Sequence, residues 1–174
     1  MSKPDKQAFF VIPFGRPDVD EVWSKVYKPV ANLLGFNDNR IDEKDDGKIK
    51  IDQIYNQLST ADIIISDLTH KRPNCYFETG YAMAKRKDEV VILCAKKGHK
   101  VHFDLLPYNV MRWDPENIDD FKTRFRKRLC ERMELISTRT AIPESVRETP
   151  ARERSKSMVG LENLAKRIRR EVTS

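Results

Sequence analysis

The sequence predicts an α/β protein in which a central parallel sheet of about five strands lies between helices on both faces. Two observations support this prediction. Short, continuous apolar runs recur along the chain, and segments with helical spacing of apolar residues separate them. Strands that are buried on both faces of a parallel sheet form such continuous runs, whereas half-exposed strands alternate apolar and polar residues. Alternating strands and helices are typical of a sheet layered between helices.

Five strands are expected, of which three are continuous apolar runs. The clearest is DIIISDL at residues 62–68, and EVVILCA at residues 89–95 is similar. Both are rich in branched apolar residues and are bounded by polar stretches, as buried strands are. The expected strands are residues 8–13, 36–40, 62–67, 89–95 and 109–113.

Four segments between or after these strands have the periodicity of helices. In residues 18–34 the apolar side chains recur at spacings of three and four, which places them on one face. Pro29 lies inside this segment and predicts a kink or a break, because proline donates no backbone hydrogen bond. Asn74 is expected to cap the third helix, since asparagine is a preferred N-cap residue. The expected helices are residues 18–34, 49–58, 74–87 and 118–133.

The composition divides the chain into a domain at residues 1–136 and a basic tail at residues 137–174. The tail holds nine Lys and Arg against five Glu, which gives +4 of the net charge of +6. Its prolines and mixed charges indicate a linker followed by a short helix near residues 161–172. The tail could contact a partner protein or a second copy of the chain. Nucleic acid is not favoured as a partner, because no aromatic residues interleave with these charges.

Composition also bears on location and on metal chemistry. No apolar run approaches the roughly 20 residues that cross a bilayer, and the first seven residues are polar, so we expect a cytoplasmic protein without a membrane segment. Three cysteines without a CxxC pair indicate neither a disulfide framework nor a structural zinc site. The histidines and carboxylates show no metal-site spacing. We therefore expect neither a metal nor a cofactor.

Polar side chains are expected to gather at the carboxyl ends of the strands, where open α/β sheets bind ligands. Phe14 and Gly15 follow the first strand, and a glycine there lets the backbone approach a ligand closely. Asp67 ends the third expected strand and could accept hydrogen bonds from sugar hydroxyls. The alternative for Asp67 is a carboxylate that caps the next turn. Asn74 and Tyr81, in the helix that follows, complete the predicted substrate-binding residues.

Glu78 is the candidate catalytic residue. It follows Asn74 one position too late to form a capping box. Its neighbours three and four residues further on are Tyr81 and Ala82, so no lysine pairs with it along the helix. A carboxylate held between aromatic residues at the mouth of the sheet can act as a nucleophile or as an acid and base. The structural alternative is an acid that gains a little stabilisation from the helix dipole.

The stretch at residues 61–93, ADIIISDLTHKRPNCYFETGYAMAKRKDEVVIL, resembles the core of the nucleoside 2-deoxyribosyltransferase-like proteins, which are distant structural relatives of TIR domains. The resemblance covers roughly the first three quarters of the chain, in order. This chain has Arg72 and Phe77 where the family usually has Asn and Tyr. The matching motifs are Pro13-Phe14, Arg40-Ile41-Asp42, Ala61-Asp62, Asp67-Leu68-Thr69, Arg72-Pro73-Asn74, Phe77-Glu78-Thr79-Gly80-Tyr81-Ala82 and Phe103-Asp104-Leu105.

The resemblance implies a flavodoxin-like (Rossmann-like) three-layer fold and a nucleoside, a nucleotide or NAD as the ligand. In the transferases a helix glutamate attacks the anomeric carbon of the sugar, and Glu78 matches that position. The expectation is therefore a nucleotide-binding protein that cleaves an N-glycosidic bond, by hydrolysis or by transfer to another base. Relatives of this kind often serve as effectors of anti-phage defence. The open alternative is a non-catalytic module that senses a nucleotide and signals to a partner protein.

Overall fold

The fold is built on a five-stranded sheet whose strands are all parallel, in the order β2-β1-β3-β4-β5. The computed structural model describes residues 6–39, 51–86, 90–105 and 107–140. The predicted α/β class is confirmed, and each strand lies within a few residues of its expected position. The strands are β1 (Lys6–Val11), β2 (Phe36–Asn39), β3 (Ile63–Asp67), β4 (Val91–Lys96) and β5 (Met111–Trp113).

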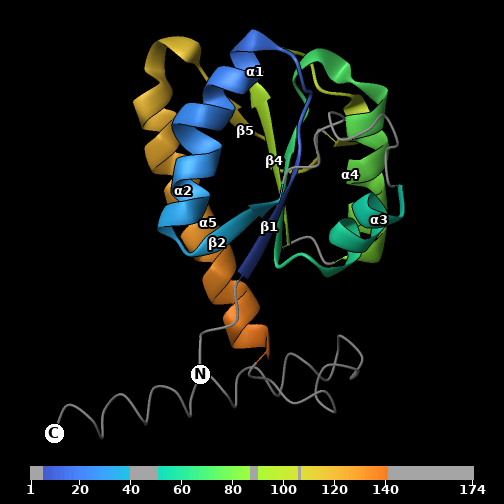
Figure 1. Cartoon of the computed structure of the whole chain (residues 1–174). Helices are drawn as coiled ribbons and strands as arrows, with labels where there is room; N and C mark the ends of the chain where they lie inside the picture. The colour runs from blue at the N-terminus through green and yellow to red at the C-terminus, as the bar shows by residue number, and fades with distance from the viewer. Residues whose placement is uncertain (1–5, 40–50, 87–89, 106, 141–174) are drawn as a thin grey trace, which may run out of the picture. The chain divides into compact units, whose positions relative to one another are not determined.

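Helices cover both faces of the sheet (Figure 1). One layer, drawn in blue and orange, holds α1, α2 and α5, and the other, drawn in green, holds α3 and α4. This three-layer arrangement and the strand order agree with a flavodoxin-like fold. The helix α5 continues past residue 136, where the domain was expected to end. The helices are α1 (Pro17–Val22), α2 (Lys28–Leu33), α3 (Ile51–Thr60), α4 (Pro73–Lys85) and α5 (Ile118–Thr140).

The first helical segment is helical from Pro17 to Leu33 without a break, and the predicted irregularity takes the form of a π-helical turn just before Pro29. Residues Trp23–Tyr27 form a turn of π-helix between α1 and α2. Pro29 lies in the first turn of α2, where its missing N–H needs no partner. The backbone N–H of Lys28 donates instead to the carbonyl of Trp23, five residues back. This wider turn carries Tyr27, whose fully buried side chain reaches the end of β3.

The core follows from the apolar runs that predicted the strands. All five residues of β3 are buried. On the α5 side of the sheet, the rings of Tyr27, Phe121 and Phe125 are fully buried, and the Tyr27 ring packs edge to face on the other two. On the α4 side, Thr79 and Ala82 are fully buried. Each large apolar side chain removed from water contributes roughly 1.5–3 kcal/mol to stability. The packed core therefore holds each strand in one orientation, which decides the layer of helices that the last side chain of the strand faces.

One expectation about a helix end is wrong, and others lie outside the described residues. The helix α4 begins at Pro73, and Arg72 rather than Asn74 is its N-cap residue, without a side-chain capping bond. Proline is favoured at the first helical position because its N–H would lack a partner there anyway. The expected loop at 43–48 and residues 141–174, with the expected terminal helix, are not described. Among the described residues no helix is long and apolar enough to span a membrane.

Candidate functional site

The carboxyl ends of β1 and β3 lie side by side, because these two strands pair in parallel. The chain runs outward from β1 to β2 and returns to β3 on the other side, so the topology switches direction between them. Doubly wound sheets bind ligands at such a switch point. Phe14 and Gly15 follow β1 here, as expected. Phe14 is half-buried, and Gly15 has a φ of +67°, a conformation that favours glycine.

Asp67 lies at the end of β3 but does not face solvent. Its exposed fraction is 0%. One carboxylate oxygen accepts hydrogen bonds from the Tyr27 hydroxyl (2.8 Å) and from the Trp113 indole N–H (2.9 Å). The other accepts from the backbone N–H of Thr69 (2.9 Å). The expectation that Asp67 binds sugar hydroxyls in a solvent-reachable pocket is therefore wrong, and its bond to Thr69 matches the turn-capping alternative.

The pleat of β3 explains this orientation, since successive side chains of a strand point to opposite faces. Ser66 points to the α4 layer, where its hydroxyl hydrogen-bonds that of Thr79. Asp67 therefore points into the layer that holds Tyr27 and α5. Because Glu78 lies on α4, the two carboxylates that we expected in one pocket lie on opposite faces of the sheet.

Glu78 lies on the side of α4 that faces the sheet. It comes three residues after buried Cys75 and four before buried Ala82, and residues at these spacings share a helix face. Its side chain is half-buried, and among the described residues no hydrogen bond or ion pair reaches its carboxylate. Burial raises the pKa of Glu78 from an ordinary 4.5 to about 7. Such partly desolvated, titratable groups are typical of catalytic nucleophiles and acid–base residues.

Two other predicted residues lie on the same helix as Glu78. Tyr81 follows it by one turn, and its half-buried ring packs on Tyr55 of α3, with ring centroids 4.8 Å apart. Asn74 is exposed one turn before Glu78. Phe77, the immediate neighbour of Glu78, is 62% exposed. The expected aromatic surroundings of Glu78 therefore stay a prediction, since the contact found for Tyr81 is with Tyr55.

A thiol nucleophile is disfavoured on this helix. Burial, followed by the charges of Glu78 and Asp67, raises the pKa of Cys75 to about 12. The thiolate is the reactive form of cysteine, and at this pKa Cys75 stays protonated near neutral pH. Glu78 is therefore the better nucleophile candidate of the two.

A polar cluster that sequence reasoning missed lies at the same carboxyl edge. Asp18, in the first turn of α1, accepts a hydrogen bond from the His70 Nε2 (2.8 Å) and pairs with the Lys96 Nζ (2.9 Å). Burial acts to raise the pKa of Asp18, but the hydrogen bonds and charges of Lys96 and His70 outweigh it and lower the pKa to about 2. The cluster joins the segments that follow β1 and β3 to the last residue of β4.

The loop that carries His70 is strained. His70 and Lys71 have φ values of +65° and +49°. This left-handed conformation costs a residue with a side chain roughly 1–2 kcal/mol. Strained residues of this kind are common at ligand sites, where surrounding contacts hold them in place. The hydrogen bond between His70 and Asp18 is one such contact.

Arg16 brings a guanidinium group to this edge. It directly follows Gly15 and is the N-cap residue of α1. Its Nε is buried and has no hydrogen-bond partner in the described part of the chain. Lys71 and Arg72, which follow β3, are exposed. Because a guanidinium binds phosphate or carboxylate through paired N–H groups, this edge is suited to an anionic ligand.

Known proteins add no assignment to this geometry. No protein-family model matches the chain. A search of curated proteins gives no significant match either. Within the residues that the structure describes, no group of three or more His, Cys, Asp or Glu side chains could hold a metal ion. The function must therefore be argued from the site itself.

Proposed function

We propose that this protein binds a nucleotide at the carboxyl edge of its sheet and cleaves the N-glycosidic bond of that ligand, with Glu78 as the nucleophile. The observation that carries the proposal is the half-buried Glu78 carboxylate, which has no partner within the described residues and a pKa raised to about 7. A structural glutamate on a helix is ordinarily solvated or paired. The resemblance of residues 61–93 to nucleoside 2-deoxyribosyltransferase-like proteins supports the same role.

The proposed reaction needs a carboxylate, a leaving base and an acceptor. Glu78 attacks the anomeric carbon of the sugar while the bond to the base nitrogen breaks, and the base leaves with the electron pair and takes up a proton. Water, or a second base, then displaces the ester and restores the carboxylate. Carboxylates perform such steps in glycosidases through oxocarbenium-like transition states. With a pKa of about 7, a large share of Glu78 is charged at neutral pH and able to attack.

The cations at the carboxyl edge support a phosphorylated ligand over a free nucleoside. Arg16 has a buried Nε without a partner within the described residues, and Lys71 and Arg72 are exposed beside the switch point. Phosphate groups match the paired N–H groups of arginine. Asp67 has no part in this proposal, because its oxygens already accept three hydrogen bonds inside the fold.

A second candidate function is nucleotide sensing without catalysis, as part of a signal to a partner protein. The observation that favours it is the cluster of Asp18, His70 and Lys96, which ties the segments after β1 and β3 to the end of β4. A ligand that competes for Lys96 or His70 would change how these segments are held, and this needs no chemical step. Glu78 would then be dispensable.

Base release from a panel of nucleosides, nucleotides and NAD, followed by chromatography, tests the proposal. We expect release by the parent protein and its loss in Glu78→Gln, which keeps the shape and removes the charge. Removal of a nucleophile lowers the rate by orders of magnitude. Glu21→Gln is the matched control, since Glu21 is an exposed carboxylate on α1. If the protein binds nucleotides saturably without releasing a base, and Glu78→Gln leaves this binding unchanged, the result would favour the nucleotide-sensing function over the enzyme.

A further inference from the structure

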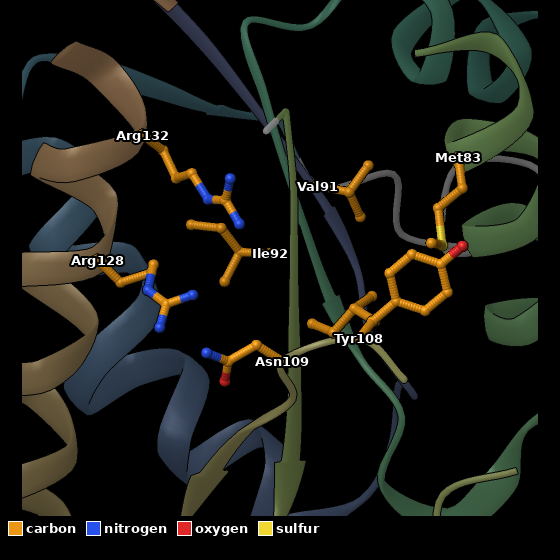
Figure 2. Close-up of a pocket in the computed structure, with 8 residues that line it drawn as sticks. Met83, Val91, Ile92, Tyr108, Asn109, Arg128 and Arg132 are labelled. Carbon is orange, nitrogen blue, oxygen red and sulfur yellow. The ribbon is translucent and has the colours of Figure 1, made fainter. Parts of the chain in front are cut away.

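A small pocket lies beside the amino end of β4 (Figure 2). Its volume is about 50 Å³, whereas one ordered water needs only about 10–15 Å³. The lining residues come from β4, α4, α5 and the segment before β5, and none of them is acidic. The pocket can therefore hold a group of several atoms, and no side chain in its lining repels a negative charge.

The sequence of α5 places two arginines on one wall of this pocket. Phe125 and Leu129 lie one turn apart on α5 and are fully buried. Arg128 and Arg132 each come three residues after one of them, and residues at this spacing share a helix face. Figure 2 shows both guanidinium groups pointing from α5 toward β4, and the amide of Asn109 lies on the same side of that strand. Three groups that can donate hydrogen bonds thus gather in one place.

These donors lack acceptors within the described part of the chain. Arg132 is half-buried, its Nε is buried without a hydrogen-bond partner, and no acid pairs with it there. The acid next to Arg128 is Glu131, whose Oε2 lies 3.6 Å from the Arg128 Nε, which is longer than a hydrogen bond. A donor that has lost water without gaining an acceptor is unfavourable, and such groups in a folded protein often mark the place of an ion. The pocket therefore favours an occupant that brings oxygen acceptors and negative charge.

We propose that this pocket binds a phosphate group, either as the free ion or as part of a small phosphate ester. Phosphate oxygens match the paired N–H groups of a guanidinium, and Arg128 and Arg132 offer two such groups. A phosphate monoester carries a charge of about −1.5 to −2 near pH 7, which balances the two arginines. The amide of Asn109 can donate to a further oxygen. A carboxylate, with one charge and two oxygens, satisfies fewer of these donors.

This phosphate pocket is separate from the proposed nucleotide site and does not rest on the proposed function. It lies beside Val91–Leu93, at the start of β4, whereas Arg16 follows the carboxyl end of β1. Because the strands are parallel, these two places lie at opposite ends of the sheet. A phosphate bound here contacts α5 and the segment before β5 at the same time. It should therefore raise the unfolding temperature, as any ligand of the folded state does.

Titration of the full chain with inorganic phosphate, followed by NMR of the arginine Nε–H signals, tests this proposal. We expect saturable shifts of the Arg128 and Arg132 signals. Arg132→Gln should weaken binding about tenfold, as expected for the loss of one charge-assisted hydrogen bond. Arg126→Gln is the matched control, since Arg126 is exposed on α5 and does not line the pocket. Arg16→Gln should leave the shifts unchanged, which distinguishes this pocket from the carboxyl edge of the sheet.

Three further ligands define the chemistry of the occupant. Tighter binding of methyl phosphate or phenyl phosphate than of inorganic phosphate would assign the pocket to an organic phosphate, and equal or weaker binding would assign it to the free ion. Acetate, which has a single charge, should bind at least about tenfold more weakly than phosphate. The proposal is overturned by the absence of a saturable shift at Arg132, by equal binding of acetate, or by an equal loss in Arg126→Gln. Binding that Arg16→Gln abolishes and Arg132→Gln leaves unchanged also overturns it, because phosphate then binds at the carboxyl edge.

Discussion

Glu78 lowers the stability of the fold whenever it is charged, which separates it from a structural residue. Its pKa is about 7 in the folded chain and ordinarily 4.5, so the folded state holds this proton more tightly than the unfolded state does. The stability that the protonated Glu78 contributes is fully present below about pH 4.5 and is lost as the pH rises through 7. A carboxylate kept at such a position despite its effect on stability fits a functional group.

We therefore predict that Glu78→Gln stabilises the protein at about pH 8 and not at about pH 4. The shift corresponds to about 1–2 kcal/mol once solvent screening of the partly exposed group is allowed for. Urea unfolding of both proteins at the two pH values measures the difference. An equal effect of the substitution at both values would show that Glu78 is not desolvated.

Asp67 is the opposite case, a carboxylate whose role is inside the fold. Asp67→Ala leaves the Tyr27 hydroxyl, the Trp113 N–H and the Thr69 N–H without their acceptor. We predict a loss of about 3 kcal/mol or more in the free energy of unfolding, since each buried donor left unpaired costs about 1–3 kcal/mol. Tyr27→Phe removes only one donor and should cost about 1 kcal/mol. Denaturant unfolding measures both, and a loss below 1 kcal/mol for Asp67→Ala would contradict this role.

Sequence reasoning placed Asp67 at the right end of the right strand but on the wrong face. A buried strand is apolar on both faces, so its composition does not say which layer a terminal side chain enters. The cluster of Asp18, His70 and Lys96 could not be predicted from the sequence, for a different reason. His70 and Lys96 lie 52 and 78 positions from Asp18, and only the parallel order of the strands brings them together.

At the scale of the element, α4 is attached to β3 by a buried hydroxyl pair. The Thr79 hydroxyl meets that of Ser66 and also donates to the carbonyl of Cys75. Both side chains are fully buried. This pair fixes the rotation of α4 about its axis, and with it the direction in which Glu78, one residue before Thr79, is presented.

We predict that Thr79→Val, which keeps the shape of the side chain, destabilises the protein by about 1–3 kcal/mol, because it leaves the Ser66 hydroxyl buried without this partner. The double variant Ser66→Ala with Thr79→Val should recover part of that loss, since no polar group is then left unpaired. Thermal unfolding of the two single variants and the double variant measures the coupling. Additive effects would show that the two hydroxyls do not depend on each other.

The elements themselves were predicted well where the signal was local. Continuous apolar runs located β1, β3 and β4, and the expected strands near β2 and β5 also lie within a few residues of the observed ones. Pro29 predicted a kink or a break, and the structure has a π-helical turn just before it. That irregularity is a π-helical turn, which depends on the packing of Tyr27 and was not predictable from the spacing of apolar residues. The start of α4 was misplaced because Asn74 is a good N-cap residue, whereas Pro73 sets the first helical position.

At the scale of the whole molecule, the parallel sheet gathers cations at one edge, because every segment that follows a strand carboxyl end lies there. Arg16, Lys71 and Arg72 come from two such segments, Lys96 ends β4, and Asp18 pairs with Lys96. We predict that 5′-phosphorylated nucleosides bind more tightly than the matched nucleosides, and that the gap narrows with salt.

Calorimetry with matched ligands measures this gap in affinity. Arg16→Gln should lower the ratio of the affinity for the phosphorylated ligand to that for the nucleoside about tenfold. The substitution removes the guanidinium whose Nε has no hydrogen-bond partner within the described residues. Lys122→Gln, an exposed change on α5, is the control. Equal affinity for nucleosides and their phosphates would assign the cations to another ligand.

The pH dependence of the rate of base release distinguishes the two chemical roles that Glu78 could have, nucleophile and general acid. Burial is the cause of its raised pKa, so the charged fraction of Glu78 increases as the pH rises through about 7. A nucleophile must be charged to attack, and the rate should then rise between about pH 6 and pH 8 and level off above. A general acid must be protonated, and the rate would fall over the same range.

Initial rates of base release across this range, measured with saturating ligand, separate the two roles. We predict the rising limb, with a midpoint near 7 that is absent in any residual activity of Glu78→Gln. Asp18, whose pKa is about 2, and Cys75, whose pKa is about 12, titrate far outside this window and cannot produce the limb. A rate that falls as the pH rises through 7 would still indicate an enzyme, but with Glu78 as the proton donor to the departing base. Water would then attack the sugar directly.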